Sequence, residues 1–113
     1  LGGAPGVRSK RWTGSTATGA ALDAENNAAV QRALEGVEDR RARYVCVAVL
    51  VRGDAEWLGE GRVEGRITTA PRGANGFGYD PYFESAELGC TFAEATPAAK
   101  ATVSHRARAV RGL

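Results

Sequence analysis

Residues 56–68, EWLGEGRVEGRIT, alternate between mostly charged residues and residues that are apolar or glycine. This alternation is the sequence feature that most constrains what the chain can fold into. The even positions are charged apart from Leu58 and Thr68, whereas the odd positions hold Trp, Val, Ile and three glycines. Successive side chains of a strand point to opposite faces, so this period of two predicts a strand with one charged face and one covered face. Glycines on the covered face predict a bend, or something that approaches the backbone closely. The charged face is interpreted as solvated or as a subunit contact.

The segment before it predicts a partner strand. Residues 42–51, ARYVCVAVLV, form a nearly continuous apolar and β-branched run, which is typical of a strand covered on both faces. Arg52, Gly53 and Asp54 then supply a turn, so the two segments are predicted to form a hairpin. The same tripeptide is an adhesion signal in some secreted proteins, but the hairpin turn is the favoured interpretation.

Two helices are predicted from periodicity and from a helix-start signal. Apolar residues at helical spacing over residues 20–35 predict an amphipathic helix, and Gly36 is a suitable stop. Thr96 followed by Pro97 is a favourable N-cap and first helical residue. A short helix is therefore predicted over 97–103.

A last helix is predicted over 105–113, with Ser104 as its N-cap and Ala109, Val110 and Leu113 on its apolar side. The residues rich in Gly, Ser and Thr, 1–19, are predicted to form a loop with a short helical turn.

Composition excludes several classes of protein. The net charge of +2 is too small to indicate nucleic-acid binding, and no apolar run approaches the ~20 residues of a membrane span. Cys46 and Cys90 form no C-x-x-C pattern, and Cys46 lies in an apolar run, which is compatible with a reducing cytoplasm. We therefore expect a cytoplasmic protein that binds neither nucleic acid nor membrane. The chain has no Met and opens with Leu-Gly-Gly, so we expect it to be a piece of a longer or processed protein.

A Gly-rich loop over residues 73–80 carries two aromatic residues, Phe77 and Tyr79, on either side of Gly78. One ring is expected to face a ligand while the other packs inward. An aromatic face stacks a purine for about 1–3 kcal/mol whatever the base. Asp80, fixed by the following proline, could accept hydrogen bonds from a base edge. The alternative is a tight turn over the core, with Asp80 capping nearby N–H groups.

Cations follow at the predicted start of the last helix. His105 and Arg106 come directly after the N-cap, where free backbone N–H groups favour an electron-rich ligand. Lys100 could point into the same space. The alternative is a helix start whose exposed cations have no function, and an RNA-contacting role for the basic end ranks lowest. Loop and cations together indicate a nucleotide site.

A metal site or a general base is not indicated. Phosphoanhydride cleavage needs Mg²⁺ on carboxylates and an activated water. The thirteen acidic residues are scattered and form no Asp-x-Asp or comparable cluster.

Four motifs occur in order: LGGAPGVRS (1–9), PRGANGFGYDP (71–81), TFAE (91–94) and KATVSHRARA (100–109). Together they resemble the C-terminal part of the inosine/xanthosine triphosphate pyrophosphatase family. The resemblance implies an α/β fold with an elongated mixed β-sheet and flanking helices, here incomplete at the N-terminus. Residues 1–113 would then be the C-terminal part of a single domain.

The resemblance also implies a function. Members hydrolyse the non-standard purine nucleotides ITP, dITP and XTP to the monophosphate and pyrophosphate, need Mg²⁺ and are typically homodimers. The family's phosphate loop and its Asp-Asp-Ser-Gly segment, which supplies a metal ligand and the general base, normally precede LGGAPG. Catalytic and metal-binding residues are thus expected upstream of Leu1, and we expect the isolated chain to be inactive. The alternative is a purine-nucleotide-binding fragment without catalysis.

By motif, the resemblance places eight residues at the substrate. Phe77 is implied to stack on the base, and His105 and Arg106 to donate hydrogen bonds to a 6-keto oxygen. The full set of implied substrate-binding residues is Phe77, Gly78, Tyr79, Asp80, Lys100, Ser104, His105 and Arg106.

Overall fold

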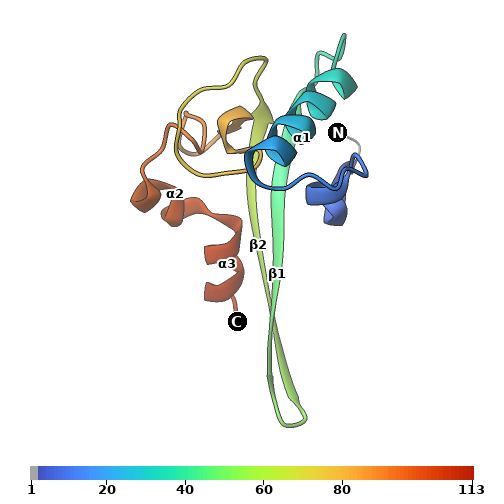
Figure 1. Ribbon diagram of the computed structural model, residues 1–113. Coiled ribbons are helices and arrows are strands. Elements are labelled where there is room, and N and C mark those ends of the chain that lie inside the picture. The colour runs from blue at the N-terminus through green and yellow to red at the C-terminus, as the bar shows by residue number, and fades with distance from the viewer. Residues whose placement is uncertain (1–2) are drawn as a thin grey trace.

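A long antiparallel hairpin forms the axis of the molecule in the computed structural model, which describes residues 3–113 (Figure 1). Strand β1 (Arg41–Arg52) pairs with β2 (Ala55–Ile67) along its whole length, from Arg41 opposite Arg66 to Arg52 opposite Ala55. The turn lies at Gly53, whose φ of 59° is left-handed and favours glycine. The predicted hairpin is confirmed.

A third strand, β3 (Phe83–Ser85), pairs antiparallel with the end of β2 and gives the sheet order β1-β2-β3. Helices flanking a sheet were expected and are present. The expected mixed sheet is not found among the described residues, because all pairings of the three strands are antiparallel.

The helices follow the sequence signals closely. Helix α1 (Gly19–Ala33) matches the amphipathic segment and ends before Gly36. Helix α2 (Pro97–Val103) has the predicted bounds, and the Thr96 hydroxyl accepts a hydrogen bond from the Ala99 N–H at 3.1 Å. The remaining helical elements are α3 (His105–Arg111) and the short 3₁₀ helices η1 (Gly6–Arg11) and η2 (Asp80–Tyr82). Helix η1 fits the short helical turn expected in the N-terminal loop, of which Leu1 and Gly2 lie outside the described residues.

Helix α3 explains the glycines of β2. The helix packs on the face of the hairpin that carries them (Figure 1). A Cβ atom at Gly59 would collide with the carbonyl of Ala109, and one at Gly61 with the carbonyl of His105. The expected close approach to the glycine backbone is confirmed, and the structure shows that the backbone of α3 makes it. This contact places the start of α3 against the sheet.

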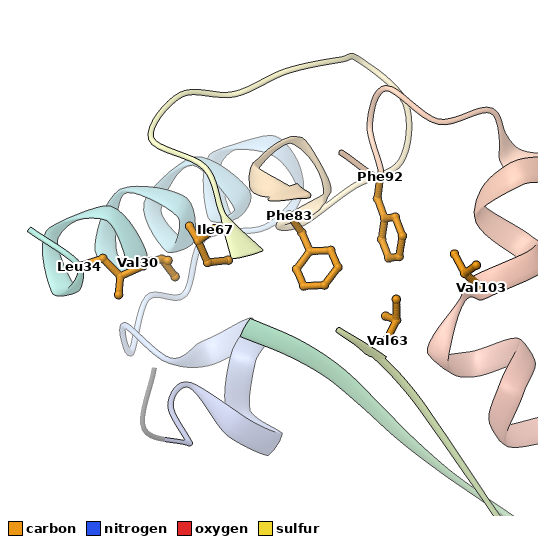
Figure 2. Close-up of a cluster of buried hydrophobic side chains, with 7 residues drawn as sticks. All are labelled: Val30, Leu34, Val63, Ile67, Phe83, Phe92 and Val103. Carbon is orange, nitrogen blue, oxygen red and sulfur yellow. The ribbon is translucent and has the colours of Figure 1, made fainter. Parts of the chain in front are cut away.

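The core lies where the base of the hairpin meets α1, β3 and α2 (Figure 2). Its buried side chains are Val30, Leu34, Val63, Ile67, Phe83, Phe92 and Val103. The ring of Tyr44 lies 4.6 Å from that of Phe83 and 5.8 Å from that of Phe92. This cluster anchors both the segment after β2 and the start of the C-terminal helices.

Two expectations about burial are wrong for the described residues. Strand β1 was expected to be covered on both faces, yet the side chains of Val45, Val47, Val49 and Val51 are between 46% and 64% exposed. They point away from α3, and no element among residues 3–113 covers that face. Helix α3 ends at Arg111, two residues short of the expected end at 113. Ala109 is buried as expected, but Val110 is 62% exposed, because only one side of this short helix meets the strands, and Leu113, beyond the helix, is 39% exposed. No helix of the described residues is long and apolar enough to cross a membrane.

Candidate functional site

Phe77 lies exposed in the Gly-rich loop, with 62% of its surface accessible. Its N–H donates to Oδ2 of Asp80 at 3.1 Å, and its carbonyl accepts from the N–H of Asp80 at 3.2 Å. Gly76 and Gly78 on either side have φ of 73° and 61°, a left-handed backbone that glycine adopts without strain. The loop therefore folds back on itself and presents the Phe77 ring outward.

Tyr79 takes the opposite direction. It is half-buried against the core, and its hydroxyl donates to the carbonyl of Ser9 at 2.6 Å. Burial raises the pKa of Tyr79, and the nearby charge of Asp23 adds to the effect. The expectation that one aromatic faces outward while the other packs inward fits this arrangement.

Asp80 is buried, with 5% of its surface exposed. Its Oδ2 accepts from the N–H of Phe77 at 3.1 Å and from Nζ of Lys100 at 2.7 Å. The structure thus gives Asp80 the local capping role that the sequence left open as an alternative. Contact with a nucleotide base stays a prediction for this residue.

Two cations gather at the Phe77 ring, as expected from the sequence. Nζ of Lys100 lies 5.4 Å from the ring centroid, and Cζ of Arg106 lies 5.5 Å from it. Lys100 is also 5.4 Å from the centroid of Phe92. All three distances are within the range of cation–π attraction. The loop, α2 and the start of α3 therefore form one surface that combines a flat ring with positive charge, although Phe77 is separated from Arg106 by about thirty residues in sequence.

His105 is held against the sheet beside this surface. Its ring stacks on Tyr44, with centroids 4.7 Å apart and planes 11° apart. Burial lowers the pKa of His105, the charges of Arg106 and Lys100 lower it further, and Asp80 acts in the opposite direction. The imidazole is thus neutral near pH 7 and can donate one hydrogen bond and accept another. Its Nδ1 is buried and has no hydrogen-bond partner among the described residues.

Ser104 has a structural role in the described residues. Its hydroxyl accepts from the N–H of Ala107 at 3.1 Å, which makes it the N-cap of α3 as predicted. The cap fixes the helix start and with it the backbone of His105 and Arg106. Substrate contact by Ser104 stays a prediction.

Sequence reasoning missed two residues that touch this loop. Oδ2 of Asp23 accepts from the N–H of Gly78 at 3.0 Å, and Nδ2 of Asn27 donates to the carbonyl of Gly78 at 3.0 Å. Both lie on α1, one helical turn apart, so they share a face. The spacing of Asp23 and Asn27, four residues apart on a predicted amphipathic helix, was the sequence signal that could have indicated a shared contact.

The described residues do not fit a magnesium site. Among residues 3–113 no group of three or more Asp, Glu, His or Cys side chains could hold a metal ion. The buried carboxylate of Asp80 is already paired with Lys100. No step of a metal-dependent reaction can be assigned to these side chains.

A family model described as the Ham1 family matches residues 1–113, the whole chain. The chain belongs to the Ham1 family. It is 52% identical over 114 residues to a dITP/XTP pyrophosphatase of Syntrophobacter fumaroxidans, covering 100% of this chain and 47% of that relative. It is 53% identical to a dITP/XTP pyrophosphatase of Burkholderia pseudomallei, covering 98% of this chain and 54% of that relative. A solved HAM1 protein from Coxiella burnetii superposes with a TM-score of 0.84 at 42% identity, over 96% of this chain and 55% of that chain.

The similarity to Ham1 proteins thus concerns both sequence and fold, and it confirms the family resemblance drawn from the motifs. The chain spans about half the length of the curated relatives that it matches.

Proposed function

We propose that the protein hydrolyses non-standard purine nucleoside triphosphates (ITP, dITP and XTP) to the monophosphate and pyrophosphate. In this proposal residues 1–113 are the C-terminal part of a single Ham1-type domain and supply its base-recognition wall. The observation that carries the proposal is the exposed Phe77 ring, with Lys100 at 5.4 Å and Arg106 at 5.5 Å from its centroid. A flat ring beside fixed cations suits a purine nucleotide, since the ring stacks the base and the cations attract its anionic groups.

Base selection is assigned to the start of α3. Arg106 is exposed and His105 is neutral beside it, so both can donate to the 6-keto oxygen of hypoxanthine or xanthine. Adenine carries an amino donor at that position, and its binding would leave the protein's donors unpaired, which discriminates strongly. Gly78, Tyr79, Asp80 and Ser104 complete the wall by fixing the loop and the helix start.

Magnesium and the general base are assigned to a segment preceding Leu1. This assignment is supported by the similarity to relatives about twice as long and by the poor fit of the described residues to a metal. Reading the DNA upstream of Leu1 tests it directly. An in-frame Asp-Asp-Ser-Gly segment is the expected result, and its absence would remove the metal and general base from the proposal.

We further propose that the protein is a cytoplasmic homodimer that binds neither nucleic acid nor membrane. Sedimentation equilibrium of the protein as its gene encodes it is expected to give twice the subunit mass.

A second candidate is a purine-nucleotide-binding module without catalysis. The absence of a metal-binding cluster among residues 3–113 favours it for this chain taken alone. Both candidates predict that the protein binds purine nucleotides, and they differ in whether the bound nucleotide is hydrolysed.

The test measures pyrophosphate release from ITP, XTP and ATP with Mg²⁺, for the gene's full product and for residues 1–113 alone. We expect turnover of ITP and XTP well above ATP by the full product, and none by the isolated residues. Turnover by residues 1–113 would contradict the view that the catalytic acids lie elsewhere. Binding of ITP by the full product without turnover would favour the second candidate.

A further inference from the structure

The backbone of Gly78 is held from both sides by one face of α1. Its N–H donates to Oδ2 of Asp23 at 3.0 Å, and its carbonyl accepts from Nδ2 of Asn27 at 3.0 Å. These two groups belong to the two peptide planes that flank the Gly78 Cα. Because peptide units are planar, fixing both planes fixes the backbone dihedrals between them, including the left-handed φ of 61°.

The same clamp determines the direction of the Phe77 ring. The peptide plane before the Phe77 Cα is tied to Asp80 through the Phe77 N–H, at 3.1 Å. The plane after it carries the Gly78 N–H and is tied to Asp23. Two carboxylates therefore set the orientation of the Phe77 Cα–Cβ bond. Phe77 as a whole residue is 62% exposed, so packing against the core contributes little to holding its ring in place.

Helix α1 is a rigid support for this clamp. Leu22, Val30 and Leu34 anchor it with at most 3% exposure each. Asn27 is 8% exposed and belongs to the buried side of the helix, whereas Glu25, two residues before it, is exposed. The Gly78 contacts thus connect a well-packed helix to an exposed loop 51 and 55 residues away in sequence.

We propose that Asp23 and Asn27 are positioning residues for nucleotide binding, which hold the Phe77 ring in the orientation that stacks a purine. The inference rests on the proposed function, because it assigns a role to Phe77 in that site. A stacking ring fixed before the ligand arrives loses little conformational entropy on binding. The pair touches the loop backbone and not the base edge, so its loss weakens binding of all purine nucleotides alike.

The test compares Asp23→Ala and Asn27→Ala with the wild type, in the protein as its gene encodes it. The Kd for IMP, which is not hydrolysed further, is measured by calorimetry, and amide hydrogen exchange of Gly78 is followed by NMR. We expect each variant to raise the Kd about tenfold, the scale of losing one hydrogen bond that orients the ring. We also expect faster exchange at Gly78. Glu25→Ala, which removes a charge from the same helix at an exposed position, is the matched control and leaves both quantities unchanged.

Asp23→Asn separates positioning from simple loss of charge. Its amide oxygen can still accept from the Gly78 N–H, so it is expected to restore most of the affinity lost in Asp23→Ala. Faster exchange at Gly78 with an unchanged Kd would overturn the positioning role and leave the proposed function intact. Unchanged exchange in both alanine variants would overturn the clamp itself. Absence of IMP binding by the wild type would instead overturn the proposed function, while Gly78 exchange would still decide whether the clamp exists.

Discussion

Nζ of Lys100 lies 2.7 Å from Oδ2 of Asp80, a carboxylate whose side chain is only 7% exposed. The same oxygen accepts from the N–H of Phe77. One buried carboxylate thus joins α2 to the loop that carries the exposed ring, and it orients Lys100 near that ring. Because Asp80 is buried, replacing one member of the pair should destabilise the fold, since the charge of the other member is left uncompensated.

We expect Asp80→Ala to lower the free energy of unfolding by roughly 3 kcal/mol, as when one partner of a buried ion pair is lost. Urea denaturation measures this. Asp80→Asn should fall between the wild type and Asp80→Ala, because its amide oxygen can still accept from the Phe77 N–H. Asp54→Ala, in the exposed hairpin turn, is the control and should change stability by no more than about 0.5 kcal/mol. An equal effect of Asp54→Ala and Asp80→Ala would contradict the structural importance of the pair.

Phe77→Ala should weaken binding of all purine nucleotides with little loss of stability. The ring is mostly exposed, so its removal empties no core, whereas a lost stacking contact costs about 1–3 kcal/mol of binding energy. The Kd values for IMP and AMP should both rise about tenfold or more. Phe77→Trp keeps a stacking face and should retain affinity. A large loss of stability with unchanged affinity would instead assign the ring to packing.

Arg106→Ala should reduce the preference for inosine over adenine nucleotides more than it reduces stability. Arg106 is exposed and makes no ion pair among the described residues, so the fold does not depend on it. The ratio of the Kd values for IMP and AMP, measured by calorimetry, is the readout. Arg111→Ala removes the same charge from the far end of α3 and should leave the ratio unchanged. Equal losses of affinity for both nucleotides would exclude Arg106 from base selection.

Local patterns in the sequence were sufficient for the hairpin and the helices. The alternation over residues 56–68 predicted the covered and exposed faces of β2 from Gly59 onward, whereas Trp57, expected on the covered face, is 44% exposed. Thr96 with Pro97 predicted the start of α2. These signals act within a few residues, where backbone geometry and capping dominate. The glycines of β2 predicted either a bend or a close approach to the strand, and the structure identifies the approaching group as the backbone of α3.

Contacts between distant segments could not be predicted in the same way. The apolar run of β1 indicated burial on both faces, but exposure depends on which elements cover the strand. In the candidate site, the motifs identified Phe77 and Arg106. They did not identify Asp23, whose contact with Gly78 joins residues 55 positions apart. Such a pair produces no periodic pattern in the sequence, because Asp23 alone is an ordinary polar residue of a helix and Gly78 alone is an ordinary glycine of a loop.

The free energy of unfolding should decrease as the pH is lowered, because His105 takes up a proton less readily in the folded state than in the unfolded chain. Its pKa is lowered in the folded state, chiefly by burial and further by Arg106 and Lys100, so the unfolded chain binds more protons near the ordinary histidine pKa of about 6.5. The stabilisation is present above that value and is lost as the pH falls through the folded pKa. His105→Gln should flatten the loss of stability between about pH 7 and pH 5, as measured by urea midpoints.

The histidine titration itself gives an independent check. His105 is the one histidine among the 113 residues, so its imidazole signal in the isolated chain is unambiguous by NMR. A titration midpoint below about 6.5 is expected, and a midpoint at or above that value would contradict the burial of the ring against Tyr44.

Gly61→Ala should destabilise the protein and weaken nucleotide binding together. A Cβ atom at this position would collide with the carbonyl of His105, so α3 must move away from β2. Overpacking of this kind costs about 1–3 kcal/mol, which urea denaturation measures, and the displaced helix start carries the proposed base-selecting residues. Gly112→Ala is the matched control, because its added Cβ would meet neighbours at 3.4–3.5 Å, an ordinary contact distance. If Gly61→Ala changed neither stability nor nucleotide binding, α3 would not rest on the glycine face of β2. The sheet would then not hold His105 and Arg106 in position at the site.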